Sequence, residues 1–175
     1  MLTLNDAKKA VNIDDTDTSQ DDELQPYMDA VMVAVEHYTG ELMSQQVVSE
    51  QHEARRQSSL MLYSLPVVAV TAVINEAGAQ WDVDGLHVDK QTGRLVSLGR
   101  PFDGFVTVTL RAGYDIVPAN YYVAALIILE QMWRTQRGPS TASFGDVPDF
   151  ASGPTGFAIP RRAEEMLGPP LGGVA

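Results

Sequence analysis

The sequence predicts an α+β fold: N-terminal helices, a small mainly antiparallel β-sheet, a long buried helix towards the C-terminus, then an extended arm with a short terminal helix. Three observations support this prediction. Apolar residues recur every three to four positions between residues 21 and 40, as on one face of a helix. They alternate with polar residues between 105 and 111, as in a half-buried strand. A continuous apolar run at residues 121–129 is followed by a stretch rich in Gly, Pro and Ser.

Two helices are predicted before the sheet. The first covers about residues 5–11, and Thr3 is suited to be its N-cap. The second covers residues 21–40, and Gly40 suits the position just past its end. We expect Pro26 to lie in the first turn, where a proline removes no helical hydrogen bond.

Five strands are predicted in the middle of the chain, separated by turns that contain glycine. They cover residues 60–65, 67–74, 86–88, 95–97 and 105–111. Both faces of the second strand are largely apolar, which predicts a central strand covered on two sides. In the last strand Val106, Val108 and Leu110 alternate with polar residues, which predicts one buried and one exposed face.

A long helix is predicted after the last strand, with Pro118 in its first position and an end near residue 137. Its run at residues 121–129 is apolar almost all round, so the helix should be buried on most faces. One small sheet can cover only one side of it. Other helices or a neighbouring subunit must therefore cover the rest. The predicted subunit contact comprises Tyr121, Tyr122, Ile127, Ile128 and Trp133.

The chain is predicted to divide into a core domain at residues 1–137, a Gly/Pro/Ser-rich arm at 138–158, and a short helix with a tail at 159–175. Apolar residues recur at three- and four-residue steps in the terminal helix, as in a helix that lies in a groove on a partner. The alternative is that this helix folds back onto its own domain. The predicted docking residues are Phe157, Ile159, Arg161, Arg162, Met166 and Leu167.

The composition excludes several kinds of chemistry. The chain has no cysteine, which rules out disulfides, thiolate catalysis and cysteine-ligated metals. Twelve basic and 23 acidic residues give a net charge of −11, which opposes tight contact with nucleic acid phosphates. No apolar run approaches the roughly 20 residues of a membrane span. The first residues also lack the pattern of a signal peptide. We therefore expect a soluble, intracellular protein.

No motif for catalysis or metal binding is complete. The acidic stretch at residues 14–19 begins like a calcium loop, but Gln20 stands where that loop needs Gly and Pro26 where it needs Glu. The three histidines are isolated in sequence, and no nucleophile elbow or phosphate loop is present. Trp133 and its neighbouring arginines are interpreted as core packing rather than a stacking patch for nucleic acid. We predict no catalytic residues, no metal and no cofactor.

The order and spacing of these elements resemble the phage head–tail connector family, also called head-completion adaptors. The opening LTLNDAK at residues 2–8 and the helix end VEHYTG at 35–40 are similar to the family's N-terminal signature. Residues 65–70 resemble the start of its first main strand, and VTVTLRAGY at 106–114 its strand–turn–helix close. Residues 158–167 resemble its terminal helix. Together these segments cover nearly the whole chain.

The resemblance implies a structural virion protein rather than an enzyme. Members of the family form a ring beneath the portal of a tailed phage capsid, extend the DNA channel and support the stopper or tail proteins. We therefore expect a homo-oligomeric ring of about twelve copies with heterologous contacts. Its C-terminal segment should engage the portal, and its sheet loops should face the next ring.

The same reading makes the chain a component of the virion neck, made in the host bacterial cytoplasm, with no membrane partner. DNA should pass through the ring without specific binding, because a negative surface repels phosphate. Two alternatives remain at this point. One is a stopper or tail-terminator neck protein, and the other is a small metal-dependent hydrolase that uses dispersed carboxylates.

Overall fold

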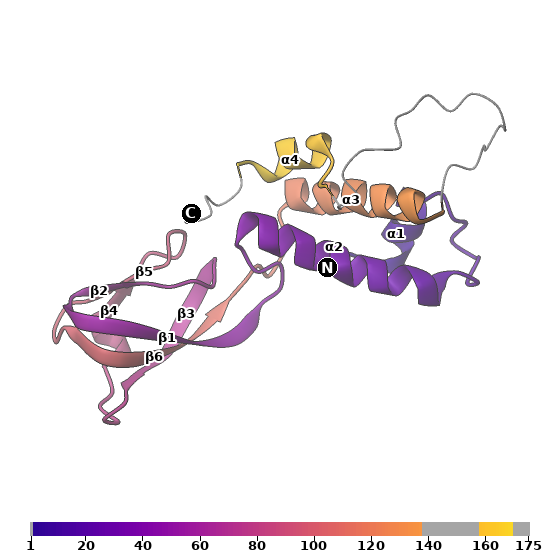
Figure 1. Cartoon of the computed structure of the whole chain (residues 1–175). Helices are drawn as coiled ribbons and strands as arrows, with labels where there is room; N and C mark the ends of the chain where they lie inside the picture. The colour runs from indigo at the N-terminus through magenta and orange to yellow at the C-terminus, as the bar shows by residue number, and fades with distance from the viewer. Residues whose placement is uncertain (1, 138–157, 170–175) are drawn as a thin grey trace. The chain divides into compact units, whose positions relative to one another are not determined.

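In the computed structural model, which describes residues 2–137 and 158–169, the chain combines four α-helices with antiparallel sheets (Figure 1). The predicted α+β class is confirmed. The chain forms two compact units. We call residues 39–118 the β unit, and residues 2–38 together with 119–175 the helical unit. The segment predicted as the core domain, residues 1–137, spans the β unit and only part of the helical unit. Most of the predicted arm lies outside the described residues.

The helical unit contains α1 (Leu4–Ala10), α2 (Asp21–Thr39), α3 (Ala119–Arg137) and α4 (Arg161–Leu167). Thr3 caps α1 as predicted, since its Oγ1 accepts a hydrogen bond from the backbone N of Asp6 at 3.2 Å. The predicted position of Pro26 is wrong, because this residue lies inside α2, beyond the first turn. It is tolerated there because it lies on the exposed side, where the carbonyl that loses its helical donor can be solvated.

The core of the helical unit is made by one face of each helix. Its buried members are Ala7, Leu24, Met28, Val31, Val35, Ala124, Ala125, Ile128, Leu129, Trp133, Ala163 and Leu167. The rings of Tyr27 on α2 and Trp133 on α3 meet edge to face with centroids 5.5 Å apart. The helices of the same chain thus cover most of the apolar run of α3, which confirms one of the two ways in which it was expected to be buried.

The β unit contains two three-stranded antiparallel sheets that share one core. Strands β1 (Gln46–Gln57), β6 (Phe102–Ala112) and β3 (Val67–Asn75) form the first sheet in that order. Strands β2 (Ser59–Met61), β5 (Arg94–Ser97) and β4 (Leu86–Val88) form the second, and a 3₁₀ turn, η1 (Val83–Gly85), precedes β4. The alternation predicted for β6 is confirmed, because Val106, Val108 and Leu110 are fully buried.

The structure differs from the predicted strands in two places. The longest strand, β1, was not predicted, because polar residues, Glu50 and His52, occupy two of its inward positions. The strand predicted at 67–74 is an edge strand, whereas β6 lies between β1 and β3 and is the central strand. The second apolar face of β3 reflects half-buried residues and two register irregularities, rather than a cover on both sides.

None of the helices in the described segments has both the length and the apolar character that a membrane crossing requires.

Candidate functional site

The predicted subunit contact on α3 is largely occupied by the chain's own packing. Ile128 is fully buried and Trp133 is 5% exposed, so neither offers a free surface. Tyr121, Tyr122 and Ile127 are half-buried. Any contact between copies on this face must therefore use the partly exposed side chains.

Tyr122 instead anchors α1 to α3. Its hydroxyl donates to Asp6 Oδ2 at 2.5 Å, and the Thr3 hydroxyl donates to the same carboxylate. The hydrogen bonds from Thr3 and then Tyr122 hold the pKa of Asp6 below its usual value. Burial, followed by the bond to the Asp6 carboxylate, raises the pKa of Tyr122 to about 12. This network has a structural role, because the Tyr122 hydroxyl and the Asp6 carboxylate are hydrogen-bonded within the chain.

The terminal helix α4 packs against α3 within the helical unit. Ala163 and Leu167 are buried, and the side chain of Asn120 on α3 donates to the carbonyl of Met166 at 2.9 Å. The Tyr38 hydroxyl donates to the carbonyl of Gly168 at 3.2 Å. The apolar face of α4 is thus covered by its own chain. The helix folds back onto its own domain and does not extend freely towards a partner.

The remaining predicted docking residues are distributed around α4. Arg161 and Arg162 are exposed, Met166 and Ile159 are half-buried, and Phe157 lies outside the described residues. Arg161 Nε lies 3.6 Å from Glu165 Oε1, one turn further along the helix. Docking through these residues stays a prediction, now limited to the exposed side of α4.

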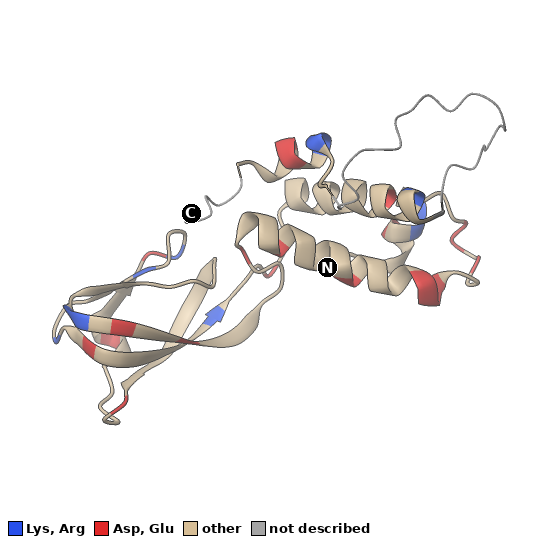
Figure 2. Ribbon diagram, in the orientation of Figure 1, with Lys and Arg blue, Asp and Glu red and all other residues tan. Residues whose placement is uncertain are grey.

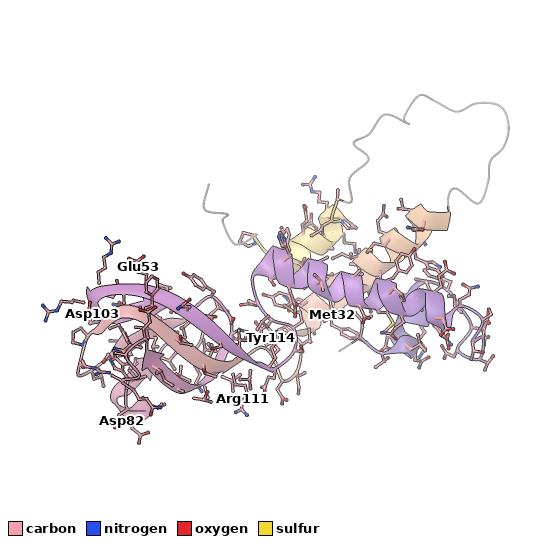
Figure 3. All side chains as sticks on the ribbon, turned by 60° about the horizontal axis from the view of Figure 1, so that its bottom comes forward. Met32, Glu53, Asp82, Asp103, Arg111 and Tyr114 are labelled. Atoms are coloured by element: carbon pink, nitrogen blue, oxygen red, sulfur yellow. The ribbon has the colours of Figure 1, made fainter. Side chains whose placement is uncertain are left out.

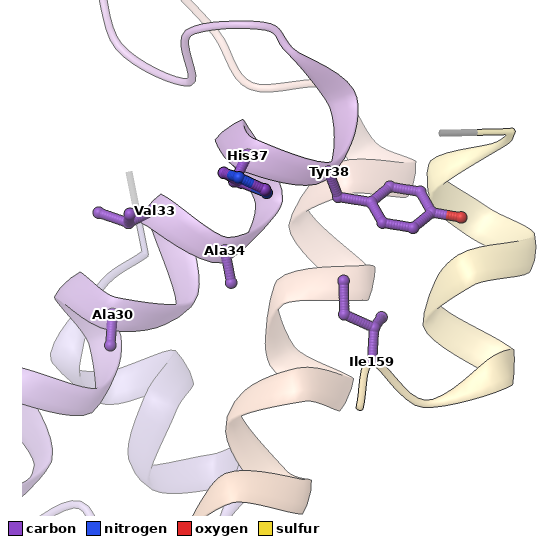
Figure 4. Close-up of a pocket in the computed structure, with 6 residues that line it drawn as sticks. All are labelled: Ala30, Val33, Ala34, His37, Tyr38 and Ile159. Carbon is purple, nitrogen blue, oxygen red and sulfur yellow. The ribbon is translucent and has the colours of Figure 1, made fainter. Parts of the chain in front are cut away.

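An apolar groove of about 420 Å³ lies along α2 in the helical unit (Figure 4). It is lined by Ala30, Val33, Ala34, His37, Tyr38 and Ile159. Val33 is 62% exposed, although it is a large apolar side chain. The sequence reasoning missed this groove. Its one signal was Val33, which lies outside the periodic apolar set of α2.

Charge is unevenly divided between the two units. The helical unit holds fourteen acidic and six basic residues, a net charge of −8, whereas nine acidic and six basic residues give the β unit −3. Acidic residues gather at the start of α2 and in the loop before it (Figure 2). The buried Lys8 neutralises one of them, since its Nζ lies 2.7 Å from Asp21 Oδ1.

The acidic stretch at residues 14–19 uses its carboxylates for local turns. Asp14 accepts from the backbone N of Thr16 at 2.9 Å, and Asp17 accepts from that of Ser19 at 2.9 Å. Hydrogen bonds from the Thr16 and Ser19 side chains, followed by these backbone bonds, lower the pKa of the two aspartates. No three potential metal ligands come together anywhere in the segments that the structure describes.

In the β unit, a buried carboxylate holds a loop onto β1. Glu50 accepts from the backbone N of Ser64 at 2.6 Å and of Tyr63 at 3.0 Å, and His52 Nε2 lies 3.0 Å from it. The rings of His52 and Tyr63 stack with centroids 4.8 Å apart. Burial raises the pKa of Glu50, but the hydrogen bonds lower it by more, so its pKa lies below its ordinary value. Sequence reasoning missed this cluster because its members are scattered along the chain.

Other carboxylates of the β unit are dispersed over its surface. Glu53, Asp82 and Asp103 project from separate places (Figure 3).

A second hollow of about 240 Å³ lies beside Trp81, whose ring is covered by the Arg100 guanidinium at 4.0 Å from the ring centroid. Arg100 also donates to the carbonyl of Gln80 at 3.2 Å, which holds its guanidinium beside the ring.

Solved structures share this fold. A chain in the neck of an empty gene transfer agent (GTA) particle, computed with C6 symmetry, matches with a TM-score of 0.68 and 20% identity over 95% of this chain and 87% of that chain. A chain in the virion of a native GTA particle matches with a TM-score of 0.62 and 21% identity, over 82% and 84%. A third, in the neck of a native GTA particle computed with C12 symmetry, matches with 0.60 and 18% over 95% and 92%.

The comparison with protein families gives a match over almost the entire sequence, whereas no curated protein matches significantly. The matching family is described as head completion protein, and it covers residues 1–169. This confirms the resemblance found from the order of the elements, and with it a structural rather than an enzymatic protein. The chain belongs to the head completion protein family.

Proposed function

We propose that this protein forms a ring in the neck of a tailed, phage-like particle, between the portal and the tail. There it would extend the DNA channel and support the attachment of the stopper or tail proteins. The observation that carries the proposal is the family match over residues 1–169. The fold likeness to a GTA neck chain over 95% of this chain supports it.

The ring is proposed to hold about twelve copies and to be built by heterologous contacts. Support comes from the symmetry of the similar particles, whose necks were computed with C6 and C12 symmetry. The location of the chain in the virion rests on the same likeness. A cyclic ring needs two unlike surfaces on each copy, and the half-buried side of α3 is one candidate.

The portal contact is proposed to use the exposed side of α4, with Arg161 and the partly exposed Met166. Phe157, in the segment before α4, is proposed to join this contact. The loops of the β unit would face the next ring on the tail side. Duplex DNA would pass without binding, because the chain carries a net charge of −11.

The test is reconstitution with the portal ring of the same particle, followed by electron cryomicroscopy. The expected result is a ring of this chain seated on the portal, with an open axial channel. A chain that binds only to the tail tube, or that plugs the channel, would instead identify a terminator or a stopper. A portal that stays bare at micromolar concentrations of the chain would overturn the proposal.

A further inference from the structure

A loop of the β unit presents an apolar side chain next to a free carboxylate. Ile116, which follows β6, is 83% exposed, the largest exposed fraction of any large apolar side chain in the described segments. Asp115 precedes it, is also exposed, and has no polar partner among the residues that the structure describes. An isolated exposed apolar residue is ordinary, but one this exposed beside an unpaired charge is suited to enter a partner's surface.

The helical unit presents the complementary pair of features. Four of its cations are neutralised within the chain: Lys8 by Asp21 at 2.7 Å, Lys9 by Asp15 at 3.9 Å, Arg134 by Glu130 at 2.6 Å, and Arg161 by Glu165 at 3.6 Å. Of the basic side chains described in this unit, Arg162 alone has no such partner. This is unexpected in a unit with a net charge of −8, where carboxylates are abundant.

Arg162 is joined to the apolar groove on α2 by a short stretch of chain. It occupies the first turn of α4, three residues after Ile159, which lines the groove and lies two residues before the start of the helix. The groove of about 420 Å³ is larger than the roughly 150 Å³ cavity that holds a benzene molecule, so an isoleucine side chain fits in it. Val33 would lose its exposure to water when the groove is filled.

We infer that the groove and Arg162 of one copy receive Ile116 and Asp115 of a second copy of this chain. Ile116 packs against Val33 and Ile159, and the Asp115 carboxylate pairs with the Arg162 guanidinium. This inference rests on the proposed function, since it names one contact between the subunits of the proposed ring.

The nature of the two surfaces is what points to a second copy. Asp115 and Ile116 belong to the β unit, and the groove and Arg162 belong to the helical unit. Each copy therefore carries both halves of the contact. Such a contact is heterologous, and it closes into a ring when the rotation between copies allows. The charges are complementary in sign, and each is unpaired within the described part of its own chain.

Charge reversal tests the pairing. Asp115→Arg and Arg162→Asp are each expected to weaken ring formation on the portal by about tenfold or more, because each variant places like charges together. The double variant, Asp115→Arg with Arg162→Asp, is expected to recover assembly. Asp84→Arg and Arg94→Asp are matched controls on exposed residues of the β unit and should assemble like the wild type. All variants are expected to keep the wild-type melting temperature, since the changed residues are exposed.

Cross-linking tests the apolar half of the contact on the free chain. Because the natural chain has no cysteine, the variant Val33→Cys with Ile116→Cys carries only the two new thiols. Mild oxidation should give a ladder of linked copies on a non-reducing gel. The control variant, Val33→Cys with Thr107→Cys, places the second thiol on an exposed position of β6 and should remain monomeric.

The outcomes separate the two proposals. If the wild type forms rings, both single charge-reversal variants also form them, and the Val33→Cys, Ile116→Cys variant gives no ladder, the inference is overturned and the proposed function stands. A fast-migrating cross-linked monomer, in which the bond forms within one copy, also overturns the inference. A bare portal with wild-type protein overturns the proposed function, and the named contact with it.

Discussion

At the scale of single residues, Glu50 shows how a buried carboxylate organises the β unit. It lies on the inward face of β1 and receives backbone donors from Tyr63 and Ser64. Hydrogen bonds to a charged group are among the stronger ones in proteins, and a buried donor left without an acceptor is costly. Glu50 therefore fixes the loop that follows β2 onto the first sheet.

We predict that Glu50→Gln lowers the free energy of unfolding by about 1–3 kcal/mol at pH 7, because the charge-assisted bonds are weakened. The folded-state pKa of Glu50 lies below its ordinary value of 4.5, so this stabilisation is fully present above pH 4.5. It is lost as the pH falls through the folded-state pKa. Urea unfolding from pH 7 to pH 3 should thus show the difference between wild type and variant shrinking at the acid end. A difference that is constant over this range would contradict the assignment.

Gly113 is a second residue whose identity is dictated by its surroundings. Its φ is +104°, and a Cβ at this position would lie 2.1 Å from the carbonyl oxygen of Ser44. Its backbone N donates to the carbonyl of Pro66 at 2.9 Å, so the backbone cannot move away freely. The residue sits where the chain leaves β6.

We predict that Gly113→Ala destabilises the protein by about 3 kcal/mol or more, from backbone strain and a clash with backbone atoms. Gly78→Ala is the matched control: φ is +78° there, but no atom lies within 4 Å of the added Cβ. Its cost should be only about 1–2 kcal/mol, that of the left-handed conformation. Thermal melts of the two variants provide the comparison, and equal shifts would refute the steric argument.

At the scale of elements, α4 illustrates how a short helix is stabilised by packing. Seven residues are too few for a helix to be stable alone in water. Burial of Ala163 and Leu167 against the helical unit, with hydrogen bonds to the carbonyls of Met166 and Gly168, supplies what the isolated helix lacks. Removing α4 should therefore destabilise the helical unit as well as remove a binding surface.

We predict that Leu167→Ala lowers the free energy of unfolding by about 2–3 kcal/mol, the lower part of the range for a buried leucine. The position near the end of the helix permits some relaxation. Glu165→Ala, on the exposed side of the same helix, should change it by less than about 0.5 kcal/mol, since exposed ion pairs contribute little. Chemical denaturation measures both. An unaffected Leu167→Ala variant would indicate that α4 does not pack in solution.

At the scale of the whole molecule, the uneven charge is the dominant feature. Fourteen of the 23 acidic residues belong to the helical unit, and they repel polyanions at low and moderate salt. Several described cations are already committed to ion pairs, so few remain to contact phosphate.

We predict that the isolated protein shows no measurable binding to duplex DNA at physiological salt, because a net charge of −11 opposes counterion release at phosphates. A gel-shift or fluorescence anisotropy titration to micromolar concentrations is the measurement. Sub-micromolar binding that weakens steeply with salt would argue against a passive channel for DNA.

Features that depend on neighbouring residues could be predicted from the amino-acid sequence. The apolar spacing of α2 and α3, the Thr3 cap of α1 and the alternation of Val106, Val108 and Leu110 were readable because local periodicity reports which side chains leave water. The order of these elements was also sufficient to indicate the family. The lack of cysteine and the net charge excluded whole classes of chemistry without any structure.

What those buried faces pack against could not be predicted in the same way, because it depends on the folded arrangement of distant segments. Strand β1 could not be predicted from the alternation of apolar and polar residues, because two of its buried residues, Glu50 and His52, are polar. Their burial is favourable only once the loop at residues 63–64 supplies hydrogen-bond partners. The return of α4 onto α3 was equally undecidable, since an apolar helix face fits a partner or its own domain alike. The spacing of apolar residues predicts that a face is buried. Which segment packs against that face depends on contacts between residues far apart in the chain.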